Sequence, residues 1–127
     1  MAHRSRLTAV LVDVPAAERD TALRFWAAAF GREAEEVPDN PEYRYLGQVT
    51  PGVEFMVQGT GDASSRVHFD IESDDVDAEV ARLTALGASE VERIKSWAIL
   101  RDPVGTTFCV VRVQVPEMFD QHATTWE

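Results

Sequence analysis

Several features are scarce in this sequence, and each scarcity excludes a class of protein. There is one cysteine, Cys109, so no disulfide can form within the chain, which is typical of a reducing compartment. No apolar run approaches the ~18 residues that a membrane span needs. The apolar run behind the basic start of the chain ends at Asp13, which is too early for a signal peptide. We therefore expect a cytoplasmic protein with no membrane partner.

Basic residues are scarce as well. The chain has 12 Lys and Arg against 22 Asp and Glu, a net charge of −10. A surface of this sign repels phosphate groups, which argues against a nucleic-acid partner and against binding to anionic membranes. The rest of the composition is ordinary, because 45% hydrophobic and 27% charged residues over 127 positions indicate one globular domain.

The first half of the chain predicts a strand, a helix and two further strands. Residues 7–14 form a continuous apolar run, typical of a strand that is covered on both faces. Helical periodicity follows over about residues 17–30, and Gly31 stands where a left-handed C-terminal cap is needed. The apolar stripe of this helix consists of Leu23, Trp26, Ala27 and Phe30. Strands are expected near 43–49 and 53–58, with a turn at Pro51-Gly52 between them.

The second half predicts the same order of elements. A strand is expected over residues 67–72, and Ser73 or Asp74 is expected to cap the helix that follows it. The apolar stripe of that helix consists of Val76, Val80, Leu83 and Leu86, and Gly87 ends it. A short strand near Val91, a longer one over 96–101, a type I turn at Asp102-Pro103-Val104-Gly105 and a closing strand over 106–113 complete this half.

Landmarks in the two halves are separated by a nearly constant number of residues. The glycines that end the helices, Gly31 and Gly87, lie 56 residues apart, and the turn glycines, Gly52 and Gly105, lie 53 apart. A period of roughly 55 residues indicates a duplicated βαβββ unit. Since one such unit cannot cover its own sheet, we predict a single α+β domain over residues 1–113, with units over 7–58 and 66–113 that pack together.

Short motifs accompany this order of elements. They are Phe25-Trp26 and Phe30-Gly31 in the first helix, His68-Phe69-Asp70-Ile71 and Asp74-Asp75-Val76-Asp77-Ala78 at the start of the second unit, and Asp102-Pro103-Val104-Gly105-Thr106 with Phe108 in the last hairpin. The whole pattern resembles the vicinal oxygen chelate superfamily, which includes glyoxalases, bleomycin-resistance proteins and extradiol dioxygenases. Within it, the chain is most similar to small actinobacterial glyoxalase-like domains.

The resemblance covers about residues 7–113 and leaves a C-terminal tail, residues 114–127, unmatched. It implies tandem βαβββ units that form a curved mixed-sheet cup, the glyoxalase-like fold. The tail carries the apolar residues Met118, Phe119 and Trp126, which are expected to cover the cup or a partner subunit, or to fray. His3 and His122, near the two termini, are expected to be solvated.

The resemblance also implies where a metal would be held. Family ligands come from the first strand of each unit, as His or Gln, and from its last strand, as Glu. The first of these positions falls near Thr8 or Ala9, neither of which binds metal well. The second falls at Glu54 or at Met56, depending on the register. His68 matches the third, and at the fourth position Cys109 stands where glutamate is usual.

This ligand set is incomplete, so we expect no metal bound by the protein alone. If a divalent ion (Zn, Mn, Ni or Fe) is present, the resemblance implies that His68, Glu54 and Cys109 hold it, because thiolate and imidazole are good zinc ligands. Otherwise Cys109 is interpreted as a small buried apolar residue.

His68 and Asp70 are the main candidates for chemistry. Val67, Phe69 and Ile71 alternate with them and form an apolar face for the helices, so His68 and Asp70 are expected to face into the cup. His68 is interpreted either as a ligand contact or as a histidine bonded within the sheet. Asp70 is interpreted either as a general base or as the partner of His68 or an arginine.

These residues leave three classes of function open. The first is a small-molecule-binding protein of the bleomycin-resistance type, with contacts at His68, Asp70, Glu54, Met56 and Cys109. The second is an enzyme, either a metal-dependent lyase, isomerase or dioxygenase, or a metal-free acid–base catalyst that uses His68 and Asp70. The third is an interaction module whose cup is filled by its own side chains. Open sheet edges and the apolar tail favour a homodimer.

Overall fold

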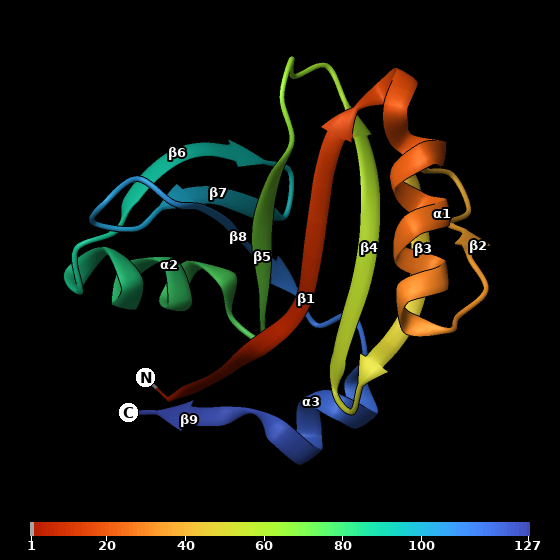
Figure 1. The fold of residues 1–127 in the computed structure, drawn as a ribbon. Coiled ribbons are helices and arrows are strands. Elements are labelled where there is room, and N and C mark those ends of the chain that lie inside the picture. Colours follow the sequence, from red (N-terminus) through yellow and green to blue (C-terminus); the bar gives the residue numbers. More distant parts are fainter. Residues whose placement is uncertain (1) are drawn as a thin grey trace. The chain divides into compact units, whose positions relative to one another are not determined.

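The chain folds into two units of the same topology, as the duplicated sequence pattern predicts. The computed structural model describes residues 2–127 (Figure 1). The N-terminal unit is Ala9–His68, and the C-terminal unit combines Phe69–Glu127 with the residues up to Thr8. The first strand and the strand over Arg66–Ser73 therefore contribute residues to both units.

The N-terminal unit contains one α-helix, one short 3-10 helix, four strands and the first residues of a fifth. Its elements are β1 (His3–Pro15, from Ala9 onward), the short 3-10 helix η1 (Ala16–Glu18), α1 (Arg19–Phe30), β2 (Glu35–Glu36), β3 (Tyr43–Thr50) and β4 (Val53–Thr60). Strand β1 pairs with β4 in parallel, and β4 with β3 and β3 with β2 are antiparallel pairs. The two-residue strand β2 is absent from the sequence prediction, and it completes the βαβββ order.

Helix α1 packs against β3 and β4 and covers the core of this unit (Figure 1). The core consists of Val12, Val14, Leu46, Phe55 and Val57, and the predicted stripe residues Leu23, Trp26 and Ala27 pack on it. The rings of Trp26 and Phe30 also contact Phe55, with centroid distances of 5.5 and 5.0 Å. Gly31 has a φ of 65° and forms the predicted left-handed cap, which β-carbons disfavour.

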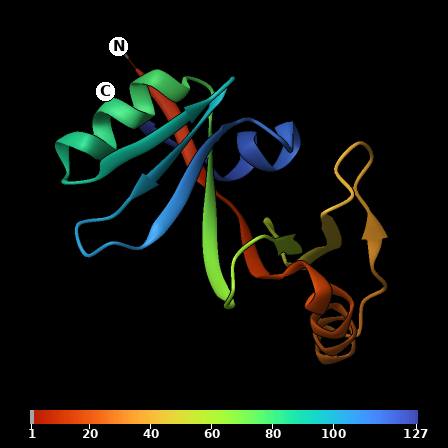
Figure 2. The ribbon, with the colours of Figure 1, turned by 90° about the horizontal axis from the view of Figure 1, so that it is seen from above.

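The C-terminal unit repeats this topology. Its elements are β5 (Arg66–Ser73, from Phe69 onward), α2 (Val76–Ala85), β6 (Ser89–Ile94), β7 (Trp97–Arg101), β8 (Thr107–Arg112), α3 (Pro116–His122) and β9 (Thr124–Trp126). Strand β5 pairs with β8 in parallel, and β8 with β7 and β7 with β6 are antiparallel pairs, as in the first unit. Figure 2 shows α2 running along these twisted and curved strands.

The core under α2 follows the predicted stripe except at its end. Val80 is buried with Ala98, Leu100 and Val110, and Val76 and Leu83 pack on this cluster. Leu86 is exposed because the helix ends at Ala85 and Leu86 is already its C-cap.

The helix cap lies one residue later than the sequence predicts. Asp75, not Ser73 or Asp74, is the N-cap of α2, and its side chain accepts a hydrogen bond from the amide of Ala78 at 3.0 Å. Asp74 is occupied elsewhere, since it accepts bonds from the amide and the guanidinium of Arg4 at 2.8 and 3.1 Å. The Ser73 hydroxyl donates to the carbonyl of Arg4 at 2.9 Å.

The tail is ordered against its own chain. Strand β9 pairs antiparallel with the start of β1, with His3 opposite Trp126 and Ser5 opposite Thr124. The start of β1 and strand β9 consequently lie side by side in Figure 1. Helix α3 buries Phe119, over which the Arg4 guanidinium lies 4.8 Å from the ring centroid.

Together these elements form a mixed α+β fold with few helices and an open mixed sheet, and the predicted fold class is confirmed. Within residues 2–127, no helix combines the length and the apolar character needed to cross a bilayer.

Candidate functional site

The candidate site begins with the alternation of side chains along β5. His68, Asp70 and Glu72 point to one face of the strand, while Val67, Phe69 and Ile71 point to the other. His68 is 9% exposed and Glu72 is fully buried, whereas Val67 is 47% and Phe69 38% exposed. Helix α2 packs on β6, β7 and β8, so the expected burial of Val67 and Phe69 against the helices is wrong.

Three polar side chains of different chemistry lie close together on this face. Asp70 is directly opposite Cys109 in the parallel pair of β5 and β8, and His68 precedes Asp70 by two residues on the same strand. One ligand atom from each of the three lies within 4.8 Å of those of the other two. Cys109 is buried, as predicted. The strand pairing therefore gathers an imidazole, a carboxylate and a thiol.

His68 is held by a carboxylate that the sequence analysis did not select. Its Nδ1 atom lies 2.5 Å from Oδ2 of Asp13, near the end of β1. Asp13 is 2% exposed, and Arg66 approaches the same oxygen at 3.7 Å. The signal available in the sequence was the single acidic residue in the apolar run 7–14, which we used only to exclude a signal peptide.

The expected ligand position near Thr8 or Ala9 carries no metal-binding group, but the first strand does supply a polar side chain at Asp13. Ala9 is opposite Glu54 in the β1–β4 register, and Asp13 is opposite Gln58. Because paired residues share a face, Glu54 and Gln58 lie on the same face of this unit as Asp13. The buried residues Phe55 and Val57 take the other face, as the alternation predicts.

Glu54 and Met56 are placed on β4, and the group formed by His68, Asp70 and Cys109 does not include them. Glu54 acts on Tyr45, which lies on the neighbouring strand β3. Burial, with the negative charge and hydrogen bond of Glu54, raises the pKa of Tyr45 from 10.0 to about 12. The phenol is therefore neutral and remains a hydrogen-bond donor at ordinary pH.

A buried ion pair stands beside the site on β5. Glu72 accepts a hydrogen bond from Nε of Arg6 at 2.8 Å, and Arg6 also donates to Oγ1 of Thr8 at 3.1 Å. The second oxygen of Glu72 accepts the amide of Gln114 at 2.7 Å. This pair thus ties β1, β5 and the start of the tail together.

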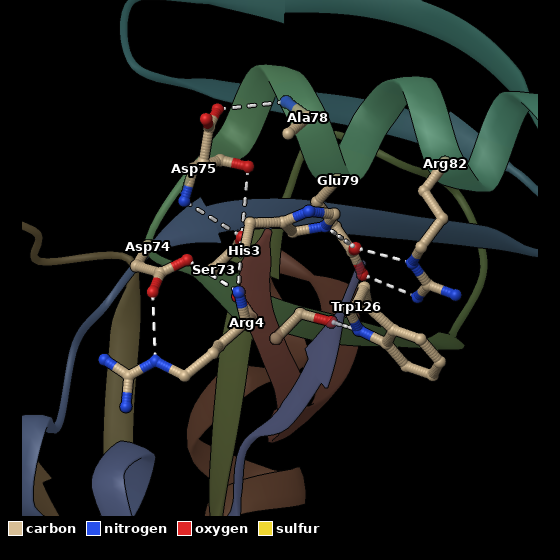
Figure 3. A network of polar contacts seen from close by, with 10 residues as sticks. His3, Arg4, Ser73, Asp74, Asp75, Ala78, Glu79, Arg82 and Trp126 are labelled. Carbon is tan, nitrogen blue, oxygen red and sulfur yellow. Dashed lines mark hydrogen bonds and ion pairs between the residues drawn. The ribbon is translucent and has the colours of Figure 1, made fainter. Parts of the chain in front are cut away.

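A second polar network lies under α2 (Figure 3). Glu79 is fully buried and accepts bonds from Nε2 of His3 at 2.8 Å and from Arg82 at 2.8 and 2.9 Å. Burial opposes ionisation of Glu79, but the bonds from Arg82 and its other donors hold its pKa below the usual value. His3 is therefore buried, and the expectation that it is solvated is wrong.

Trp126 closes this network at the end of the chain. Its Nε1–H donates to the Ser5 hydroxyl at 2.9 Å, and the Arg82 guanidinium lies 3.8 Å from its ring centroid (Figure 3). A largely apolar groove of about 550 Å³ opens beside it. The groove is lined by Ser5, Arg6, Leu7, Phe69, Ile71, Glu79, Arg82, Asp102, Thr106, Phe108, Thr124 and Trp126.

His68, Asp70 and Cys109 offer the same ligand types as the set implied by the resemblance, with Asp70 in place of Glu54, and they lie close enough together to share one ion. Imidazole, carboxylate and thiolate are all zinc ligands, and three protein ligands leave a position open for substrate. Metal-bound histidines are commonly oriented by a carboxylate on their other ring nitrogen, which is the role that Asp13 has toward His68 here.

Two βαβββ units in one chain define the glyoxalase-like fold. A family model described as a glyoxalase-like domain matches residues 9–111, and the chain belongs to that family.

Solved structures show the same fold at low sequence identity. Methylmalonyl-CoA epimerase from Mycobacterium tuberculosis is 16% identical, with 87% of this chain and 89% of that chain covered and a TM-score of 0.60. A hypothetical protein from Bacillus halodurans C-125 is 12% identical over 87% of this chain and 97% of its own, with a TM-score of 0.60.

A third structure, Streptomyces coelicolor methylmalonyl-CoA epimerase in complex with 2-nitronate-propionyl-CoA, is 15% identical, covers 85% of this chain and 98% of its own, and has a TM-score of 0.53. No curated protein matches the sequence significantly. At these identities the solved structures establish the fold alone.

Proposed function

We propose that this protein binds a small organic ligand on the face of β5 that carries His68 and Asp70, as a glyoxalase-like binding protein of the bleomycin-resistance type. The observation that carries the proposal is the proximity of an imidazole, a carboxylate and a thiol, with ligand atoms within 4.8 Å of one another. Ligand sites need a few convergent polar groups of this kind. Glu54 and Met56 are further proposed contacts.

A thermal-shift screen of aromatic and dicarbonyl compounds against chelator-treated protein tests this proposal. A ligand at about ten times its dissociation constant stabilises the folded state by roughly 1.4 kcal/mol, which raises the Tm of a chain of this size by about 4–7 °C. We expect His68→Ala to abolish the shift. The matched control is His122→Ala, which removes an exposed histidine of the tail and leaves the shift unchanged.

The proposal fails if no compound in the screen stabilises the protein, or if the two histidine variants respond alike. The first result would favour an interaction module, and the second would place the ligand away from β5.

A divalent-metal-dependent lyase, isomerase or dioxygenase is the second candidate. The observation that favours it is the hydrogen bond between Nδ1 of His68 and Oδ2 of Asp13, because a carboxylate in this position commonly orients a metal-binding histidine. His68, Asp70 and Cys109 would hold the ion. When bound, the ion would polarise a substrate oxygen as a Lewis acid.

Metal analysis of protein purified without chelator separates the two candidates. Stoichiometric zinc, manganese, nickel or iron supports the enzyme, and metal-free protein that still binds ligands supports the binding protein. Asp70→Asn and Glu54→Gln are a matched pair, because only one of the two carboxylates belongs to the structural group. We expect Asp70→Asn alone to lower the metal content.

A cytoplasmic location and a homodimer remain predictions. The tail no longer supports the dimer, because β9 is already paired with β1 of the same chain.

A further inference from the structure

Asp13 has an unusual environment for a carboxylate. It lies on β1 among the buried residues Leu11, Val12 and Val14, and it is itself 2% exposed. Oδ2 contacts Nδ1 of His68, but Oδ1 is buried and accepts no hydrogen bond from any residue between 2 and 127. An unsatisfied buried oxygen of this kind is costly, and in native proteins it calls for an explanation.

The neighbouring side chains do not satisfy Oδ1. Gln58 is opposite Asp13 in the sheet but makes no hydrogen bond to this oxygen. Arg66 approaches Oδ2 at 3.7 Å, and its guanidinium is paired at 3.1 Å with Asp62, outside the buried region. The unsatisfied Oδ1 therefore lies on the same carboxylate as the oxygen that contacts His68.

The bond to Oδ2 determines which nitrogen of His68 carries a proton. A carboxylate can only accept, so Nδ1 of His68 must donate. In the neutral ring, Nε2 is then the nitrogen with the lone pair. Asp13 thereby sets both the orientation and the tautomer of His68.

We propose that Asp13 is the positioning residue of the His68 site and that its Oδ1 accepts an O–H or N–H from the ligand. The inference rests on the proposed function, and it adds a ligand class: compounds with a hydroxyl or amine donor, rather than compounds whose oxygens are all carbonyl or ether. Such a donor would satisfy the one oxygen of Asp13 that the protein leaves unpaired.

The tautomer is tested first, because it needs no ligand. Multiple-bond ¹H–¹⁵N spectra of protein labelled at histidine report which ring nitrogen of neutral His68 is protonated. We expect protonation at Nδ1 in the wild-type protein and at Nε2, or exchange between the two, in Asp13→Ala. A wild-type His68 protonated at Nε2 would overturn the positioning role, whether or not a variant folds.

The ligand contact is tested with phenol and its methyl ether, anisole, which differ in a single O–H. Binding is followed through the His68 side-chain resonances in chelator-treated protein. We expect phenol to bind at least about tenfold more tightly than anisole, the usual value of one hydrogen bond to a charged acceptor. Asp13→Ala should abolish this preference, and the isosteric Asp13→Asn should weaken it.

The control variant is Asp62→Ala, which removes the other carboxylate near Arg66 and should leave both results unchanged. Equal affinity for the two probes, or no binding of phenol, overturns the Oδ1 contact. If the tautomer is as expected but the compound screen finds no ligand, the proposed function fails and the positioning role stands.

Discussion

At the scale of single residues, substitution of the buried charged residues is expected to cost the most stability. The Arg6–Glu72 pair is almost entirely inaccessible, and each member satisfies further groups, Arg6 at Thr8 and Glu72 at the amide of Gln114. Removal of one member leaves the other charged and buried, which is far more costly than loss of a surface pair.

We predict that Glu72→Ala lowers the free energy of unfolding by about 3–5 kcal/mol, because the buried Arg6 guanidinium loses its carboxylate partner. Denaturant unfolding followed by circular dichroism measures the change. The matched control is Glu90→Ala, which breaks the exposed pair of Glu90 with Arg93 and should cost less than about 1 kcal/mol. Equal losses in the two variants would contradict a special role for the buried pair.

Tyr45 gives a prediction for alkaline pH. Its folded pKa of about 12 lies above the ordinary 10.0, so the neutral phenol stabilises the folded state. That contribution is complete below pH 10 and is lost as the pH rises toward 12. Absorbance titration of Tyr43→Phe, which leaves Tyr45 as the remaining tyrosine, measures the pKa directly.

Glu54→Gln tests the cause of this shift. The variant should lower the pKa of Tyr45, because it removes the negative charge, but burial should keep the value above 10.0. A pKa that does not change would show that Glu54 has no effect on the phenol.

At the scale of helices and strands, periodicity predicted most of the fold. The two helices, their apolar stripes, the Gly31 cap and the hairpin turn closed by the bond from the Gly105 amide to the Asp102 carbonyl at 3.0 Å all follow from spacing. The ends of helices and strands were harder to predict, because they depend on partners far away in the sequence. β1 begins at His3 because β9 pairs with it, and nothing local to residues 3–6 indicates that pairing.

The candidate site shows the same division between local and distant information. Alternation along β5 was enough to select His68 and Asp70, the family resemblance had selected Cys109, and the register of β8 places Cys109 opposite Asp70. Asp13 was missed because its role depends on His68, 55 residues later, and an acidic residue in an apolar run has no spacing that specifies a partner.

Helix α2 gives the prediction at this scale. Asp75→Ala should cost about 1 kcal/mol of stability, because the Ala78 amide loses its acceptor, whereas Asp75→Ser should retain most of the cap. Thermal unfolding of the two variants measures the difference. Equal destabilisation by both substitutions would show that capping at residue 75 is unimportant.

At the scale of the whole molecule, the charge on the edge strands restricts how two copies of the chain can associate. The edge strands of the two units carry charge: β2 consists of two exposed glutamates, and β6 contains Glu90, Glu92 and Arg93. Charged edges oppose pairing with a second copy through backbone hydrogen bonds. A dimer would therefore use apolar side chains, and Phe25 on α1 is 63% exposed.

We predict that light scattering gives twice the chain mass of 14.1 kDa, and that the dimer persists in high salt because apolar contacts are not screened. Phe25→Asp should yield monomer, while Val104→Asp, at an exposed turn, should not. A mass of 14.1 kDa at every concentration would rule the homodimer out.

The division of β1 between the two units has a consequence for biosynthesis. The Ala9–His68 unit is contiguous, so all of its residues have left the ribosome while the rest of the chain is still being translated. The other unit needs residues that are far apart in the sequence, since β9 (Thr124–Trp126) pairs with His3–Ser5. Its assembly must wait until β9 has been synthesised, and residues 3–5 have to stay available until then.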